Sequence, residues 1–118
     1  MTFLIPTDET GNNIIAYSVC LTDDGVLFGS KNKIFFYNYQ DATFRLLQTF
    51  DLEPNYNVTL LSLWDKRTLL CCSRWQGLLL LDLNTGKCRR PPFDCGKEIM
   101  NVLIDSQKRI WVAPYNGG

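Results

Sequence analysis

Residues 68–82 read Thr-Leu-Leu-Cys-Cys-Ser-Arg-Trp-Gln-Gly-Leu-Leu-Leu-Leu-Asp, and this stretch decides the fold. An apolar run of strand length meets a short polar break that ends in Gly77, and a second apolar run follows at once. This pattern is typical of two antiparallel strands joined by a tight turn. The stretch therefore predicts a β-hairpin with strands at residues 68–73 and 78–83.

The same unit occurs twice more along the chain. Residues 26–37 read Val-Leu-Phe-Gly-Ser-Lys-Asn-Lys-Ile-Phe-Phe-Tyr, and residues 110–118 read Ile-Trp-Val-Ala-Pro-Tyr-Asn-Gly-Gly. The small residues that follow the apolar run in each copy, Gly29, Cys72 and Ala113, are spaced by 43 and then 41 residues. Each period has room for four short strands. Four strands in about 40 to 45 residues is the length of one β-propeller blade.

The remaining strands are predicted from apolar runs between turn signals. We expect strands at residues 14–21, 26–30, 34–39, 43–50, 58–64, 68–73, 78–83, 88–93, 99–104 and 110–113. Pro91 and Pro92 place the strand at 88–93 on the edge of its sheet, because proline cannot donate a ladder hydrogen bond. No segment carries a sustained period of 3.6 residues, so no helix is predicted.

These strands predict an all-β fold, a fragment of a β-propeller with about two and a half four-stranded antiparallel blades. Residues 17–57 and 58–98 are predicted to form one blade each. Residues 1–16 would hold the end of a preceding blade, with a strand at 2–5, and a connecting loop. Residues 99–118 would form the first half of a following blade. Since a propeller needs at least four blades, we expect the chain to be a piece of a longer polypeptide. A self-contained β-sandwich is the alternative, because regularly spaced short strands also suit it.

The composition argues against several classes of function. Twelve basic and twelve acidic residues cancel, so no electrostatic footprint for nucleic acid or anionic lipid is present. No apolar run reaches the length that spans a bilayer, and no direct membrane contact is expected. The chain has no histidine, the commonest general base, and no placed pair of catalytic carboxylates. We therefore do not expect this piece to be an enzyme.

The cysteines and acidic residues do not indicate a metal or cofactor. The five cysteines include no Cys-x-x-Cys pair, and the acidic residues near positions 8 and 23 lack the spacing of a calcium loop. We interpret the cysteines as small buried hydrophobes. A disulfide between Cys88 and Cys95 is the alternative in an oxidising compartment.

The hairpin at residues 109–118 resembles the repeat of the two-component regulator propeller family. That repeat runs roughly Asp-x-x-Gly-x-Leu-Trp-Ile-Gly-Thr, a short loop, then Gly-Leu-x-x-Tyr-Asp. Here residues 110–112 match Leu-Trp-Ile, while Ala113 and Pro114 replace Gly-Thr. In the first cycle Gly29-Ser30 stands for Gly-Thr and Tyr37-Asn38 for Tyr-Asp. In the second cycle Leu70 takes the tryptophan place, and Leu81-Asp82 matches Tyr-Asp.

The resemblance implies an extracytoplasmic sensor region of a hybrid two-component histidine kinase. Such a region would be periplasmic, as part of an inner-membrane protein. It would bind a ligand, often an oligosaccharide, and signal across the membrane to a kinase region elsewhere in the protein. The alternative is an intracellular β-propeller scaffold for protein interactions, which five cysteines without obvious pairing favour slightly.

The candidate ligand-binding residues are Arg74, Trp75, Tyr115 and Asn116. They fall in loops between second and third strands, where an aromatic ring can pack on the C–H face of a sugar and polar groups can bind its hydroxyls. The alternative is that these rings pack on a neighbouring blade. Trp111 is predicted to be a core residue because it lies within a strand. We also expect self-association, through the open edge of the strand at 110–113 or through propeller dimerisation.

Overall fold

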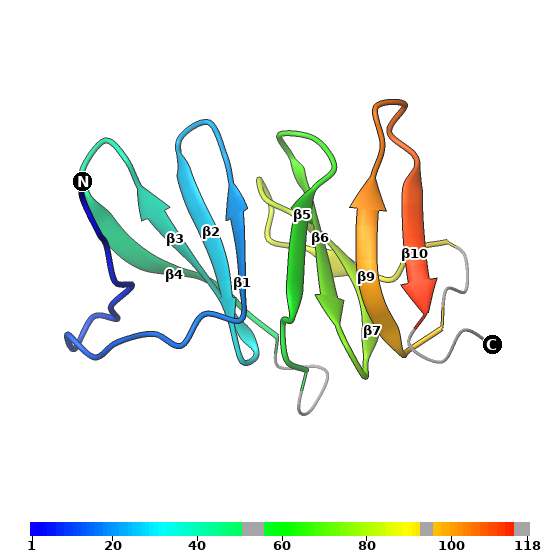
Figure 1. Ribbon diagram of the computed structural model, residues 1–118, viewed down its shortest axis with the longest axis horizontal. Coiled ribbons are helices and arrows are strands. Elements are labelled where there is room, and N and C mark those ends of the chain that lie inside the picture. The colour runs from blue at the N-terminus through cyan, green and yellow to red at the C-terminus, as the bar shows by residue number, and fades with distance from the viewer. Residues whose placement is uncertain (51–55, 93–95, 115–118) are drawn as a thin grey trace.

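The computed structural model describes residues 1–50, 56–92 and 96–114, in which there are ten strands and no helix (Figure 1). The strands are β1 Ser18–Leu21, β2 Gly25–Ser30, β3 Lys33–Asn38, β4 Thr43–Thr49, β5 Leu60–Leu63, β6 Thr68–Ser73, β7 Gly77–Asp82, β8 Cys88–Arg89, β9 Ile99–Ile104 and β10 Ile110–Pro114. No helix in this part of the chain is long and apolar enough to cross a membrane.

The strands form three antiparallel sheets that stand side by side (Figure 1). The first sheet has the order β1-β2-β3-β4, the second β5-β6-β7-β8, and the third pairs β9 with β10. The first strand of each sheet lies beside the first strand of the next, since β1 contacts β5 and β5 contacts β9. Sheets that stand side by side with their first strands next to each other have the arrangement of blades in a β-propeller. The predicted propeller fragment is therefore confirmed, and the alternative of a β-sandwich is wrong.

The strand register confirms the repeat alignment. In each sheet the turn between the first two strands is closed by one pair: Leu21 with Val26, Leu63 with Leu69, and Ile104 with Ile110. The alignment residues Gly29, Cys72 and Ala113 each follow the second member of that pair by three positions. The three hairpins are therefore equivalent in register as well as in sequence.

Two separate cores lie between the sheets, one for each pair of neighbours. The first core combines Leu27 and Ile34 of the first sheet with a face of the second sheet that includes Leu69, Leu79 and Leu81. The second core packs the opposite face of the second sheet against the third sheet; its members are Leu70, Cys72, Leu78, Leu80 and Ile99, with Val102, Ile104, Ile110 and Val112 packed against them. Because the second sheet is buried on both faces, β6 and β7 have continuous apolar sequences and do not alternate between apolar and polar residues.

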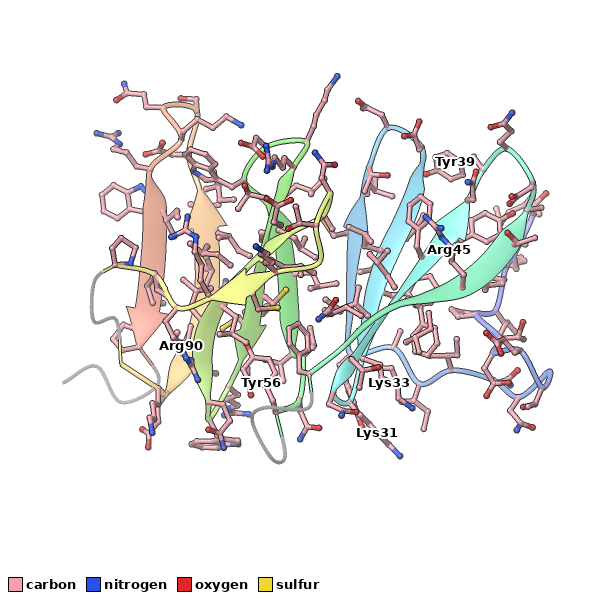
Figure 2. All side chains as sticks on the ribbon, turned by 180° about the vertical axis from the view of Figure 1, so that it is seen from behind. Lys31, Lys33, Tyr39, Arg45, Tyr56 and Arg90 are labelled. Carbon is pink, nitrogen blue, oxygen red and sulfur yellow. The ribbon has the colours of Figure 1, made fainter. Side chains whose placement is uncertain are left out.

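The connection between the first two sheets forms part of the first core. Tyr56 and Val58 are fully buried there, and the ring of Tyr56 lies 5.1 Å from that of Phe50 (Figure 2). The Val58 amide donates to the Lys31 carbonyl at 2.7 Å. The Ile99 amide donates to the Arg74 carbonyl at 3.0 Å, which is the same contact between the second and third sheets. Each blade is thus fixed to the next by a backbone hydrogen bond at the turn between second and third strands.

Most predicted strand ends shift by one or two residues, and three predictions differ more from the structure. No strand forms at residues 2–5, where Phe3, Leu4 and Ile5 are exposed, because no described strand offers their backbone a partner. The first strand is shorter than predicted and begins at Ser18, where pairing with Gly29 begins. The predicted strand at 88–93 is reduced to β8, which does lie at the edge of its sheet as the prolines require.

Trp111 is not in a core. Its side chain is 58% exposed on β10, and its indole Nε1 donates to the Asp105 carboxylate at 2.8 Å. The prediction was wrong because the apolar residues of β10 that enter the second core are Ile110 and Val112, and Trp111 points to the opposite face. Cys88 is a free thiol. Cys95, its partner in the disulfide alternative, lies outside the described residues.

Candidate functional site

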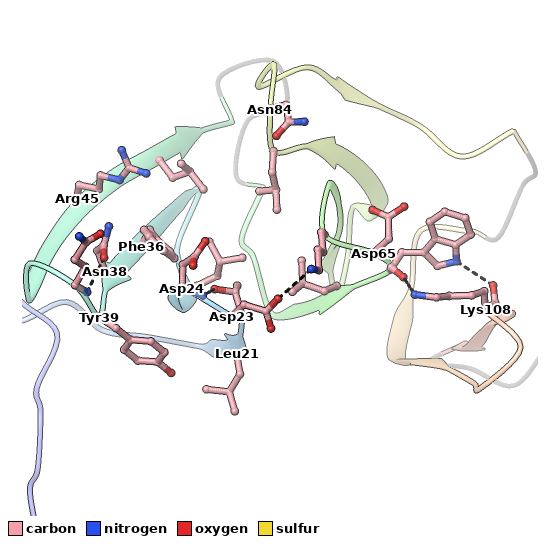
Figure 3. A pocket seen from close by; sticks show the side chains of 18 residues that line it. Leu21, Asp23, Asp24, Phe36, Asn38, Tyr39, Arg45, Asp65, Asn84 and Lys108 are labelled. Carbon is pink, nitrogen blue, oxygen red and sulfur yellow. Dashed lines mark hydrogen bonds and ion pairs between the residues drawn. The ribbon is translucent and has the colours of Figure 1, made fainter.

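A groove of about 1160 Å³ lies between the first and second sheets (Figure 3). It opens at the end of the molecule that carries the β1–β2, β5–β6 and β9–β10 turns, which is the top in Figure 1. One wall comes from the first sheet: Leu21, Thr22, Asp23, Asp24, Leu27, Phe36, Asn38, Tyr39, Gln40, Arg45 and Leu47. The facing wall consists of Leu63, Trp64, Asp65, Lys66, Leu83, Asn84 and Lys108.

The bottom of the groove is apolar and its rim is polar. Leu27, Leu47 and Leu63 belong to or pack against the first core, so the groove is continuous with the packed space between the blades. At the rim, the Arg45 guanidinium lies 5.4 Å from the centre of the Phe36 ring, its cross-strand neighbour. Tyr39 is exposed, and its ring packs edge-on against that of Tyr37, with 6.2 Å between the ring centres. An apolar bottom with polar groups around it is the usual make-up of a small-ligand pocket.

One ion pair crosses the mouth of the groove. Lys66 Nζ lies 3.5 Å from Asp23 Oδ2, and this pair joins the β5–β6 turn to the β1–β2 turn (Figure 3). Both side chains are largely exposed, and pairs of this kind contribute only about 0 to 1 kcal/mol. A ligand that competes for either charge can therefore open the contact at little cost.

Trp64 and Lys108 form a reciprocal contact at the other side of the groove. The Trp64 indole Nε1 donates to the Lys108 carbonyl at 2.9 Å, and the Lys108 ammonium donates to the Trp64 carbonyl. The same ammonium lies 5.8 Å from the centre of the indole ring. Lys108 has a positive φ of 62° in the β9–β10 turn, and its contacts with Trp64 join this turn to the second sheet. The groove wall is thus built from all three sheets.

Several polar groups near the groove serve to form turns. The Asp65 carboxylate accepts from the amides of Arg67 and Thr68, at 2.8 and 2.7 Å, and these bonds hold the pKa of Asp65 below its ordinary value. The Asn38 side chain accepts from the Gln40 amide at 2.8 Å. Asp82, at the equivalent strand end of the second sheet, accepts from the amide of Asn84 at 2.9 Å. Asn38 and Asp82 therefore have a structural role, because each fixes the turn that follows its strand.

Two of the predicted site residues, Arg74 and Trp75, do not line this groove. Arg74 and Trp75 lie in the turn between β6 and β7, at the opposite end of the molecule, with the Arg74 guanidinium 5.2 Å from the centre of the Trp75 ring. Trp75 is 53% exposed. Tyr115 and Asn116 lie outside the described residues. Within those described, no three His, Cys, Asp or Glu side chains are grouped to hold a metal ion.

Sequence reasoning missed the groove because its rim consists of residues that were interpreted as turns. Asp23, Asp24, Gln40, Asp65 and Lys66 each suit a turn when considered singly. The available signal was topological: in an antiparallel repeat, the turns after first strands all lie at one end, so residues in equivalent turns of successive blades face each other.

Comparison with known proteins supports the fold. The chain is similar to two crystal structures of the extracellular domain of BT4673 from B. thetaiotaomicron, described as a one component system in one and as a hybrid two component system in the other. In both the TM-score is 0.70 and the sequence identity is 20%. The match covers 94% of this chain and 16% of that chain. No protein-family model and no curated protein matches the chain.

Proposed function

We propose that this chain is part of the extracellular, ligand-sensing region of a two-component-type sensor. The observation that carries the proposal is the three-blade arrangement, which superimposes on the extracellular domain of BT4673 with a TM-score of 0.70. The repeat motif supports it independently, since Tyr37-Asn38 and Leu81-Asp82 end equivalent strands in equivalent register. In the proposal the segment lies outside the cytoplasmic membrane and carries no enzymatic step; the kinase activity would belong to another part of the protein.

The ligand in this proposal is an oligosaccharide, and its site is the groove between the first two blades. The groove presents the aromatic ring of Phe36 on its wall, together with carboxylate, amide and guanidinium groups at its rim. A sugar offers C–H faces that pack on such rings and hydroxyls that donate to and accept from such polar groups. Because the groove spans blades, a bound sugar would change how one blade contacts the next, which is the structural change that a sensor needs.

Calorimetric titration with a panel of neutral and acidic oligosaccharides tests the proposal. The groove variants are Arg45→Ala, whose side chain is exposed, and Phe36→Leu, which replaces the ring by an apolar side chain and should leave the fold intact. We expect each to weaken binding at least about tenfold, equivalent to about 1.4 kcal/mol. Trp75→Ala, at the opposite end, is the matched aromatic control and should bind as the wild type does.

Two results would overturn parts of the proposal. If no oligosaccharide binds, the sugar ligand is wrong. If Trp75→Ala abolishes binding and the groove variants do not, the ligand site lies at the β6–β7 turn, where sequence reasoning placed it.

A further inference from the structure

Arg45 is the outermost member of a row of side chains that crosses the first sheet and faces the second. Its cross-strand partner on β3 is Phe36. Phe36 in turn pairs with Leu27 on β2, and Leu27 pairs with Cys20 on β1. Leu27 belongs to the first core, and Cys20 and Phe36 pack against that core. Because cross-strand partners share a face, the row brings the charge of Arg45 to the wall of the groove (Figure 3).

The other two cations that line the groove are engaged in joining the sheets. Lys66 is paired with Asp23, and the ammonium of Lys108 donates to the carbonyl of Trp64. Arg45 differs from both, because it forms no ion pair with a carboxylate among the described residues. Its guanidinium lies over the Phe36 ring instead, 5.4 Å from the ring centre. This contact holds the cation in place without using its N–H donors in a conventional hydrogen bond.

The carboxylates of the groove do not neutralise Arg45. Asp23 is paired with Lys66, and Asp65 accepts from two amides of its own turn. Asp24 also lines the groove, but it lies in the β1–β2 turn and forms no ion pair with Arg45. Its carboxylate can accept hydrogen bonds from hydroxyl groups. The groove therefore offers one cation for an anionic group and, apart from it, acceptors for hydroxyls.

We propose that the ligand of the groove is an acidic oligosaccharide, with a carboxylate of the sugar bound by Arg45. This inference rests on the proposed function and names the class of ligand for the same groove. A guanidinium donates two parallel hydrogen bonds to a carboxylate, and such charge-assisted bonds are roughly twice as strong as neutral ones. The hydroxyls of the same ligand would bind the side chains of Asp24, Gln40 and Asn84, which also line the groove.

The second sheet supplies a matched control for Arg45. The equivalent row of cross-strand partners consists of Ser62, Leu70, Leu80 and Arg89. Arg89 is exposed, as Arg45 is, and it also lies on the outermost strand of its sheet, but it does not line the groove. Arg89→Gln therefore removes the same charge at the same register position outside the site.

Calorimetric titration with matched charged and neutral ligands tests the inference. The ligands are oligosaccharides of galacturonic, glucuronic and mannuronic acid, each compared with its own methyl ester, which has nearly the same shape and no charge. We expect the wild type to bind one of the acids at least about tenfold more tightly than its ester. Arg45→Gln should bind that acid and its ester equally, whereas Arg89→Gln should keep the wild-type preference.

The ratio of the two affinities separates recognition of charge from damage to the fold. A variant with a disturbed groove loses affinity for the acid and for the ester alike, so the ratio is retained. Circular dichroism checks that each variant keeps the β structure. The wild-type ratio requires no substitution, so it tests the inference even if a variant fails to fold.

The outcomes also separate this inference from the proposed function. An acid and ester that bind the wild type equally, or an Arg45→Gln variant that keeps the preference, would overturn the acidic ligand and leave an oligosaccharide sensor in place. The same holds if only neutral oligosaccharides bind, or if Arg89→Gln abolishes the preference. Failure of every oligosaccharide to bind would overturn the inference and the proposed sugar ligand together.

Discussion

The buried hydroxyl of Tyr56 provides a quantitative test of how the first two blades are held together. Tyr56 is fully buried, and its hydroxyl lies 2.9 Å from the Cys71 carbonyl and 3.1 Å from the Gly77 carbonyl. Tyr56→Phe keeps the ring and removes the donor. A lost hydrogen bond costs about 1 kcal/mol, and about 3 kcal/mol where buried partners are left unsatisfied. We expect a loss of about 1 to 3 kcal/mol in the free energy of unfolding.

Tyr56→Ala removes the ring as well and leaves a cavity against Phe50. Truncating a buried aromatic side chain costs about 3 to 5 kcal/mol. Small domains are stable by only about 5 to 15 kcal/mol, so this variant should be close to unfolding at 25 °C. The two variants therefore separate the contribution of the hydroxyl from that of the ring.

Urea unfolding followed by tryptophan fluorescence measures both effects. Tyr39→Phe is the control, because Tyr39 is exposed and its loss should change stability by less than about 0.5 kcal/mol. Burial raises the pKa of Tyr56 above its ordinary value of about 10. The neutral hydroxyl is thus favoured in the folded state, so the stability it provides is present below pH 10 and is lost as the pH rises further. Tyr56→Phe should lose this alkaline dependence.

The reasoning would be refuted if Tyr56→Phe unfolds within about 0.3 kcal/mol of the wild type. That result would mean that the hydrogen bonds from the Tyr56 hydroxyl to the two carbonyls do not stabilise the folded state. A cost below about 1.5 kcal/mol for Tyr56→Ala would show that the segment between the sheets does not contribute to the first core.

Two further predictions concern the turns and the sheet interior. Hydrogen bonds from the Trp111 indole and the Arg109 amide lower the pKa of Asp105 to about 2, so the stability this carboxylate provides is present above its ordinary pKa and is lost as the pH falls toward 2. Asp105→Asn should flatten the acid-unfolding curve, and coincident curves for variant and wild type would contradict this role. A Cβ atom at Gly25 would lie 1.9 Å from the Tyr37 carbonyl oxygen, so Gly25→Ala should break the pairing of β2 with β3 and abolish the cooperative transition in circular dichroism. Gly11→Ala, which meets no heavy atom within 4 Å, should cost only the backbone strain of its positive φ, about 1 to 2 kcal/mol, and a comparable small loss at Gly25 would show that the sheet can adjust.

The strands that could be predicted well are those whose apolar runs are continuous. β6 and β9 have the predicted bounds. Their residues pack into the cores, so each strand is an apolar run whose ends are marked by polar residues. Strand ends were less certain where apolar residues continue past the last backbone pair. Ile15 and Tyr17 extend the run before β1, yet pairing with β2 begins only at Ser18.

The environment of single side chains could not be predicted in the same way. An apolar residue in a strand is buried only if another layer covers its face, and this decides the difference between Leu70, at 2% exposed, and Trp111, at 58%. The candidate site has the same limitation. Arg74 and Trp75 are adjacent in sequence and were found together, whereas Asp23 and Lys66 meet only because two blades bring their turns side by side.

The three tryptophans allow the most direct measurement of the proposed function. Each indole N–H reports one region: that of Trp64 the groove wall, through its bond to Lys108, that of Trp75 the β6–β7 turn at the opposite end, and that of Trp111 the exposed face of the third sheet. We would titrate the ¹⁵N-labelled chain with oligosaccharides at fixed protein concentration and follow the three indole signals by nuclear magnetic resonance. Ligand sensing in the groove predicts a saturable shift of the Trp64 signal while those of Trp75 and Trp111 remain unchanged. A shift confined to Trp75, or no shift with any sugar, would contradict it.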